Sequence, residues 1–290
     1  MGYQNKTNIY DQYRLIICDI WGVLHNGKNY FPKAVSFLKD FIESGGLVIL
    51  LTNAPRRSDT VRDYLLNMGI DKDICQNIVS SGDCSFDWIT TLDNKALYHI
   101  GPDKDNSLFD KININKANLN NCEECICTGF FDEYIETIEN YTKILKSLKD
   151  REITLHCANP DLYVNKDSQI LPCAGLIAKK YIEIGGEVVY FGKPYSSIYD
   201  LVLKKANEIL KDNILKEHVL AIGDGFYTDI MGASMYNIDT LLVVNGVHSN
   251  EIYEYIGNTN FDIKKITDYI LENNINIKMP KYIQHELDFF

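Results

Sequence analysis

Short apolar runs that each stop at an acidic residue constrain this chain more than any other feature. Residues 15–18 are Leu-Ile-Ile-Cys and lead to Asp19, and residues 219–223 are Val-Leu-Ala-Ile-Gly and lead to Asp224. Such a run predicts a buried parallel strand that brings its last residue to the carboxyl edge of a sheet, where open α/β folds bind ligands. We therefore expect Asp19 and Asp224, with Asp229 behind it, to converge at one sheet edge.

Helix-like segments alternate with these strands. Pro32 opens a run whose apolar residues recur at helical spacing, and Gly45-Gly46 ends it. Since right-handed crossovers place helices on the faces of a parallel sheet, the alternation predicts a doubly wound parallel-sheet α/β core. The further core strands are expected at 47–52, 187–191, 219–223 and 239–244, with helices at about 195–210 and from Asp229.

The middle of the chain has enough strands and helices to fold as a smaller α/β unit of its own. Strands are expected at 96–100, 124–127 and 153–157, with a long helix near 132–148. We therefore expect a core domain formed by residues 1–82 and 176–290. An inserted cap domain over 83–175 would be joined to it near Ser80-Ser81-Gly82 and Leu171-Pro172. The first two strands of the core sheet would precede the cap and the rest would follow it.

Composition excludes several classes of partner. The net charge of −11 and the scattered basic residues argue against binding to nucleic acid or to an anionic membrane. No stretch approaches the roughly 20 apolar residues of a membrane span. Residues 1–6 lack the apolar run of a secretory signal, so a cytoplasmic location is expected.

The eight cysteines are expected to be reduced. Cys18, Cys127 and Cys157 lie inside apolar strand-like runs, where a thiol behaves as a small hydrophobe. Cys122 and Cys125 form one C-x-x-C, but no second Cys or His pair follows at the spacing of a tetrahedral zinc site. The sequence therefore favours neither a disulfide framework nor a zinc site.

Polar residues follow four separate apolar runs. Singly, Asp19 could cap a turn, Thr52 could be a helix N-cap and Lys193 could be a solvated loop lysine. Together with Asp224 and Asp229 they would give one sheet edge a nucleophile, a hydroxyl, a cation and an acidic pair, which are the groups that phosphoryl transfer needs. Three converging carboxylates repel one another unless a cation lies between them, and oxygen ligands suit Mg²⁺.

These motifs resemble those of the haloacid dehalogenase superfamily of aspartate-nucleophile hydrolases. The matching segments are Asp19-Ile-Trp-Gly-Val23, Leu51-Thr52-Asn53, Gly192-Lys193-Pro194 and Gly223-Asp224-Gly-Phe-Tyr-Thr-Asp229. Ala158-Asn159-Pro160-Asp161 and Leu171-Pro-Cys-Ala-Gly175 are similar to the end of the class IIA cap of NagD-type nucleotide and sugar phosphatases. The resemblance extends over about residues 12–255. It implies a Rossmann-like core with an inserted C2-type cap.

The resemblance also implies a Mg²⁺-dependent phosphatase for a small phosphorylated metabolite. Asp19 would attack phosphorus and form an aspartyl-phosphate, Thr52 would bind the phosphoryl oxygens, and Lys193 would neutralise charge. The implied metal ligands are Asp19, the Trp21 carbonyl, Asp224 and Asp229. The implied substrate-binding residues are Trp21, Gly22, His25, Asn53, Asn159, Pro160 and Asp161. A homo-oligomer formed through the cap is allowed.

Trp21 departs from the pattern of these phosphatases, which carry a second aspartate two residues after the nucleophile. That aspartate protonates the leaving group, and an indole cannot transfer a proton in its place. General acid–base catalysis is typically worth about 10²–10⁴-fold. His25 and Asp83 are candidates for the missing group.

Two other functions stay open at this point. The dehalogenases of the superfamily have a bulky aromatic residue at the position of Trp21, so a metal-independent 2-haloacid dehalogenase is one alternative. The extra charge of Asp224 and Asp229 argues against it, because carbon–halogen displacement needs no magnesium site. The second alternative is a slow or inactive protein that binds phosphate ligands and has a regulatory role.

Overall fold

The computed structural model describes residues 9–166, 169–257 and 261–288. Residues 1–6, on which part of the expectation of a cytoplasmic location depends, lie outside these ranges. The chain divides into two compact units, each discontinuous in sequence. The first unit contains residues 1–51, 62–78 and 199–290, and the second contains residues 52–61 and 79–198.

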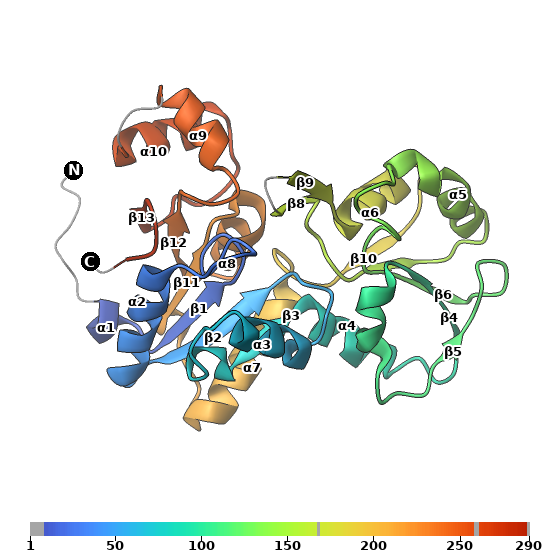
Figure 1. The fold of residues 1–290 in the computed structure, drawn as a ribbon, viewed down its shortest axis with the longest axis horizontal. Helices are drawn as coiled ribbons and strands as arrows, with labels where there is room; N and C mark the ends of the chain where they lie inside the picture. Colours follow the sequence, from blue (N-terminus) through green and yellow to red (C-terminus); the bar gives the residue numbers. More distant parts are fainter. Residues whose placement is uncertain (1–8, 167–168, 258–260, 289–290) are drawn as a thin grey trace. The chain divides into compact units, whose positions relative to one another are not determined.

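A six-stranded sheet with the order β13-β12-β11-β1-β2-β3 forms the framework of the first unit (Figure 1). Its central strand β1 pairs in parallel with β11 on one side and β2 on the other, and β12 and β13 continue the parallel array. The strands β1, β2 and β11 are buried along their whole length, as expected for a sheet covered on both faces. The strands are β1 Leu15–Asp19, β2 Leu47–Thr52, β3 Ile78–Ser80, β11 Val219–Gly223, β12 Asp239–Val243 and β13 Tyr282–Gln284.

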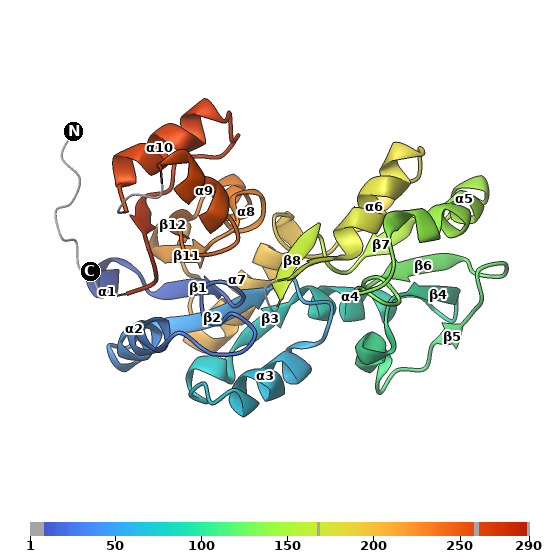
Figure 2. The same ribbon diagram turned by 45° about the horizontal axis from the view of Figure 1, so that its top comes forward.

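The helices around this sheet follow from local sequence signals. In α2, Pro32 occupies the first turn, and Ala34, Phe37, Leu38 and Phe41 recur at helical spacing and are buried. Helices α9 and α10 lie beside β12 (Figures 1 and 2). Side chains of these three elements and of β13 form one apolar cluster. The α-helices are α1 Ile9–Gln12, α2 Pro32–Glu43, α3 Ser58–Asn67, α7 Ser196–Leu210, α8 Met231–Met235, α9 Ser249–Tyr255 and α10 Ile263–Glu272.

The second unit is built on a five-stranded sheet with the order β10-β7-β6-β4-β5. All of its pairings are parallel, and a separate antiparallel hairpin joins β8 to β9. The strands are β4 Ala96–Ile100, β5 Asn115–Lys116, β6 Glu124–Cys127, β7 Leu155–Cys157, β8 Tyr163–Lys166, β9 Gln169–Pro172 and β10 Val188–Tyr190. The α-helices are α4 Ser81–Ile89, α5 Thr142–Asp150 and α6 Ala174–Glu183.

The predicted fold class is confirmed, since a parallel α/β core sheet is present together with a second, smaller α/β sheet. The assignment of the strand at 187–191 to the core sheet is wrong. Its counterpart β10 pairs with β7 of the second sheet, with Tyr190 opposite Cys157. The division into a core of 1–82 and 176–290 and a cap of 83–175 stays a prediction.

The predicted start of the long helix near 132–148 is also wrong. A 3₁₀ turn covers Ile138–Tyr141, and α5 begins only at Thr142. The side chain of Asp132 accepts a hydrogen bond from the backbone of Tyr134, and Thr137 and Asn140 form a capping box. These local bonds offer the backbone an alternative to a helix before residue 138, although the apolar spacing there is helical.

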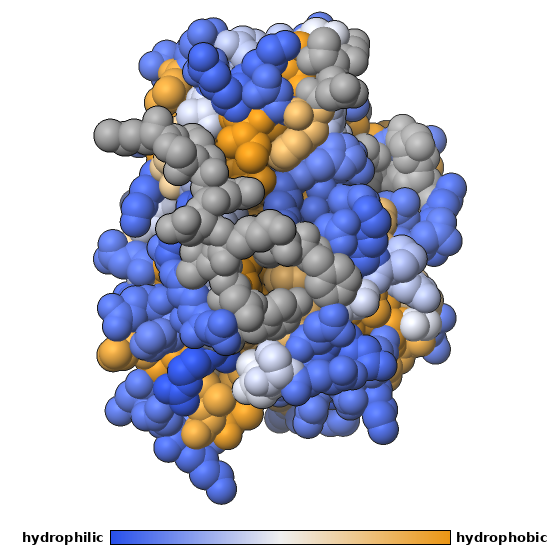
Figure 3. All heavy atoms as spheres, turned by 90° about the vertical axis from the view of Figure 1, so that its left-hand side faces the viewer, coloured by the Kyte–Doolittle hydropathy of each residue, from blue (hydrophilic) through white to orange (hydrophobic). Residues whose placement is uncertain are grey.

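Hydrophilic side chains cover most of the described surface on the face shown in Figure 3, and apolar side chains appear between them. This is the usual mixture on a globular protein. Among the described residues, none of the helices combines the length and the apolar character that crossing a lipid bilayer requires.

Candidate active site

Three aspartates meet at the carboxyl ends of β1 and β11. Asp19 is the last residue of β1, Asp224 follows β11 directly, and Asp229 lies in the π-helical turn Phe226–Ile230. One carboxylate oxygen from each of the three lies within 4.8 Å of the others, and each residue is only 6% exposed. The parallel pairing of β1 with β11 brings the two strand ends together, as the sequence predicted.

Asp224 is held by a loop that the sequence motifs did not identify. The backbone N–H of Val247 donates a hydrogen bond of 2.6 Å to Oδ2 of Asp224. Gly22 and Gly246 both pack against this carboxylate, since a Cβ at either position would overlap its oxygen Oδ2. The available signal was the end of the apolar strand at 239–244, which is followed by Asn245 and Gly246 in the same way that β11 is followed by Asp224.

Asp229 is fixed by its own turn. Its Oδ2 accepts hydrogen bonds from the backbone N–H of Gly225 at 3.2 Å and from the hydroxyl of Thr228 at 3.3 Å. A Cβ at Gly223 would overlap the Asp229 side chain, so this glycine lets the carboxylate lie close to the end of β11. The turn therefore sets the direction of Asp229 toward the other two aspartates.

The donor set of this cluster fits a hard divalent cation. All three groups offer carboxylate oxygens, which Mg²⁺ and Ca²⁺ prefer over nitrogen or sulfur ligands. Three buried carboxylates of like charge are costly without a positive charge among them. In the part of the chain that the structure describes, no other group of three or more His, Cys, Asp or Glu residues could hold a metal ion in this way.

The loop after β1 is organised around Trp21 and His25. Their rings make an edge-to-face contact with centroids 5.1 Å apart, and a Cβ at Gly27 would lie 2.6 Å from the Trp21 ring. His25 is 2% exposed, and its Nδ1 accepts a 3.0 Å hydrogen bond from the backbone N–H of Gly27. Burial lowers the pKa of His25 to about 4, so its imidazole is neutral at pH 7. These contacts favour a structural role, and proton transfer by His25 stays a prediction.

Asp83, the other candidate for proton transfer, caps a helix. Its Oδ2 accepts a hydrogen bond from the backbone N–H of Ser80, and the Ser80 hydroxyl accepts one from the Asp83 N–H, so that a capping box starts α4. Its Oδ1 accepts hydrogen bonds from both the N–H and the hydroxyl of Ser58 at 3.0 Å. Both carboxylate oxygens therefore already accept hydrogen bonds, Oδ1 from the first residue of α3 and Oδ2 from the residue before α4.

The remaining predicted polar residues form a second group, within the second unit. Asn53 bonds to the main chain of Lys193 and to the side chain of Asp161, and Asn159 accepts a hydrogen bond from the Asp161 backbone. Lys193 and Asn53 are each 3% exposed. Thr52, the last residue of β2, is 8% exposed and accepts a 3.1 Å hydrogen bond from the backbone N–H of Ala54.

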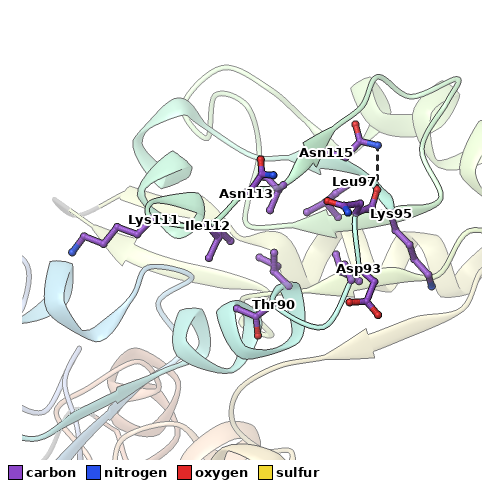
Figure 4. Close-up of a pocket in the computed structure, with 12 residues that line it drawn as sticks. Thr90, Asp93, Lys95, Leu97, Lys111, Ile112, Asn113 and Asn115 are labelled. Atoms are coloured by element: carbon purple, nitrogen blue, oxygen red, sulfur yellow. Dashed lines mark hydrogen bonds between the residues drawn. The ribbon is translucent and has the colours of Figure 1, made fainter.

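A pocket of about 420 Å³ lies elsewhere in the second unit, between the end of α4 and the segment 111–115 (Figure 4). Its wall includes Thr90, Lys95 and Asn113, and Asn115 closes one side by donating a 3.2 Å hydrogen bond to the carbonyl of Asn94. No residue predicted for the active site lines this pocket. The pocket therefore includes no residue of the aspartate cluster and none of the group around Asn53.

Family models and a solved structure both match this chain, and both agree with the family that the sequence motifs resemble. The family model described as haloacid dehalogenase-like hydrolase matches residues 16–115, and the one described as HAD-hydrolase-like matches residues 190–272. The solved structure of a hydrolase of the haloacid dehalogenase-like family from Brucella suis 1330 is 30% identical. The match covers 99% of this chain and 100% of that one, with a TM-score of 0.84.

Two further similarities are more distant. A structure described as a putative nagD protein has the same fold, with a TM-score of 0.66 at 20% identity over 81% of this chain and 90% of that one. An acid sugar phosphatase of Staphylococcus aureus (strain USA300) is 25% identical over 83% of this chain and 90% of its own length. The superfamily predicted from the four motifs is thus confirmed, and the chain belongs to the haloacid dehalogenase-like hydrolase family.

Proposed function

We propose that this protein is a Mg²⁺-dependent phosphatase that acts on a small phosphorylated metabolite through an aspartyl-phosphate on Asp19. The observation that carries the proposal is the buried cluster of Asp19, Asp224 and Asp229. A metal-independent dehalogenase would have no use for the second and third carboxylates of this cluster. The acid sugar phosphatase among its relatives supports a phosphate ester as the substrate.

The metal would be held by Asp19, Asp224, Asp229 and the carbonyl of Trp21. Bound there, it would offset the charge of the carboxylates and of the phosphoryl group. An oxygen of Asp19 would attack phosphorus as the bond from phosphorus to the ester oxygen breaks, and water would then release phosphate from Asp19. Thr52 would donate a hydrogen bond to the phosphoryl oxygens, and Lys193 would neutralise their charge.

The source of the proton for the leaving group is where this chain departs from the phosphatase pattern that its motifs resemble. At position 21 it has an indole instead of a carboxylic acid. Substrates whose leaving group is already a stable anion, such as aryl and acyl phosphates, would depend least on a proton donor. We therefore propose that the protein favours such esters over alkyl phosphates.

The test is a panel of phosphate esters that includes 4-nitrophenyl phosphate, acetyl phosphate and sugar phosphates, assayed with and without Mg²⁺. Phosphate release that requires Mg²⁺ supports the proposal. Halide release from 2-chloropropionate without metal would support the dehalogenase alternative instead. Binding of phosphate esters without turnover would support the regulatory alternative.

Asp19→Asn is the decisive variant, because an amide is too poor a nucleophile to form the phosphoenzyme but keeps the shape of the side chain. Turnover should fall below detection while circular dichroism and thermal unfolding stay close to those of the parent protein. Residual activity above a few per cent would exclude Asp19 as the nucleophile.

A further inference from the structure

Asn53 makes three hydrogen bonds with its side-chain amide, all within the second unit. Its Oδ1 accepts from the backbone N–H of Lys193 at 2.7 Å, and its Nδ2 donates to the backbone carbonyl of Lys193 at 3.1 Å. The same Nδ2 donates to Oδ1 of Asp161 at 2.8 Å. One side chain thus satisfies both main-chain polar groups of the lysine that the family motif assigns to charge neutralisation.

The orientation of this amide follows from hydrogen-bond chemistry. A backbone N–H can only donate, so the oxygen of Asn53 must face the N–H of Lys193. Both Nδ2 hydrogens then point to acceptors, one to the Lys193 carbonyl and one to the Asp161 carboxylate. If the amide were flipped, its NH₂ would face the Lys193 N–H, so that two donors would meet. Its oxygen would face the Lys193 carbonyl and the Asp161 carboxylate, so that acceptors would meet at both of these contacts. Asp161 therefore favours the one orientation in which Asn53 can bind Lys193.

The surroundings leave little freedom for the three residues. Gly192 has a φ of +117°, and a Cβ there would lie 2.6 Å from Oδ1 of Asn53 and 2.8 Å from the hydroxyl of Ser81. On the other side, the Asp161 backbone N–H donates to Oδ1 of Asn159 at 3.1 Å. Asn53 and Lys193 are both buried, so the loss of a bond between them would take a hydrogen bond from a buried polar group.

We propose that Asn53 is a positioning residue that fixes the main chain of Lys193, and that Asp161 acts in turn by orienting the Asn53 amide. This assigns the two side chains a role other than the direct substrate contact expected from the sequence. The inference deepens the proposed function and rests on it for the catalytic role of Lys193. Through Asn53, the carboxylate of Asp161 would act on a lysine that lies more than thirty residues later in the chain.

Hydrogen exchange tests the contact independently of activity. In Asn53→Ala, the backbone amide of Lys193 should exchange at least tenfold faster than in the parent protein, because it has lost its acceptor. Asp161→Ala, a milder change at a more exposed residue, should accelerate the same amide by a smaller factor. Unchanged exchange of the Lys193 amide in both folded variants would overturn the proposal. The hydrogen-exchange test does not depend on activity. If the protein hydrolysed none of the phosphate esters of the panel, only the proposed function would fail.

Kinetics test the catalytic consequence. Misplacement of a catalytic group by about 1 Å can cost roughly 10²-fold in rate, so Asn53→Ala and Asp161→Ala should lower kcat and leave KM within a few fold. Asp161→Asn keeps an oxygen that can accept from Asn53 and should recover most of the loss. The double variant of Asn53→Ala with Asp161→Ala should be no worse than Asn53→Ala alone. A loss confined to KM, or an Asp161→Asn as defective as Asp161→Ala, would mean that the carboxylate binds substrate and would overturn the proposal.

Discussion

The backbone N–H of Val247 lies 2.6 Å from Oδ2 of Asp224 and donates a hydrogen bond to it. This bond joins the loop after β12 to the residue that follows β11. Hydrogen bonds to a charged acceptor are roughly twice as strong as neutral ones, and partners behind a metal ligand set its direction. The loop at 246–247 therefore helps to orient Asp224 within the aspartate cluster, although none of the four family motifs includes this loop.

Gly22→Ala should disable the cluster with little effect on the rest of the fold. A Cβ at residue 22 would overlap the Asp224 carboxylate and turn it away from Asp19 and Asp229. Changes behind a metal ligand typically cost about 10–100-fold in metal affinity. Calorimetric titration with Mg²⁺ should show a loss of this size, together with a similar loss of phosphatase activity.

Gly45→Ala is the matched control for that variant. Gly22 and Gly45 both have positive φ, +82° and +95°, so alanine at either position costs on the order of 1–2 kcal/mol of backbone strain. A Cβ at Gly45 meets no atom within 4 Å. Both variants should therefore lose the stability that this strain costs, and only Gly22→Ala, whose Cβ also overlaps the Asp224 carboxylate, should lose Mg²⁺ affinity. Equal affinity in both would show that Gly22 does not position Asp224.

The rate of hydrolysis should depend steeply on the pKa of the leaving group. Position 21 supplies no carboxylic acid, so the departing oxygen must leave as an anion or take its proton from elsewhere. A series of substituted phenyl and alkyl phosphates gives the slope. Trp21→Asp should flatten it and speed the hydrolysis of alkyl phosphates. A shallow slope in the parent protein that survives His25→Ala would mean that another group already transfers the proton.

Acid should destabilise the protein partly through His25. Burial lowers its folded-state pKa from 6.5 to about 4, so the unfolded chain binds more protons than the folded one between these values. The stability due to neutral His25 is fully present above pH 6.5 and is lost as the pH falls toward 4. At about 1.4 kcal/mol per pH unit, the loss amounts to at most about 3 kcal/mol.

Urea unfolding of the parent protein and of His25→Asn at pH 7 and pH 4 measures this contribution. Asparagine cannot take up a proton but keeps an oxygen that can accept from Gly27, so the pH 4 loss should shrink by about 2–3 kcal/mol. His218→Asn, at a histidine whose side chain is 41% exposed, serves as the control. An identical loss in all three proteins would contradict the prediction.

Asp83→Ala should reduce stability and spare catalysis. The variant loses the capping box of α4 and two hydrogen bonds from Ser58, and loss of a helix cap typically costs about 1–2 kcal/mol. Thermal unfolding and kcat should be measured on the same preparation. If kcat fell by more than tenfold at a temperature where the variant is fully folded, Asp83 would have to be reconsidered as the proton donor.

The sequence predicted the acidic cluster well because the rule behind it is local. A parallel strand brings its last residue to one edge of the sheet, so Asp19 and Asp224 could be brought together from two apolar runs alone. No comparable local rule predicted which of the two sheets contains β10. A strand of three residues does not encode its partner, and the pairing of Tyr190 with Cys157 is a long-range contact.

Two other features depended on side-chain hydrogen bonds that apolar spacing does not reveal. The helix α5 starts late because Thr137 and Asn140 cap the chain just before it. The orientation of Asn53 is set by Lys193 and Asp161, which lie 140 and 108 residues away along the chain. The motif singled out Asn53 as a site residue, but only the structure could show what its amide binds.

All eight cysteines, each within the described part of the chain, are free thiols, and seven of them are buried. Burial raises the pKa of Cys75 to about 11 and that of Cys157 to about 12, so almost none of the reactive thiolate exists in the folded protein. Alkylation at these sites must wait for local opening of the chain. Cys75 belongs to the first unit and Cys157 to the second, so their labelling rates under native conditions would report separately how often each unit opens. The chain thus contains its own chemical probes of whether its two halves unfold together or one at a time.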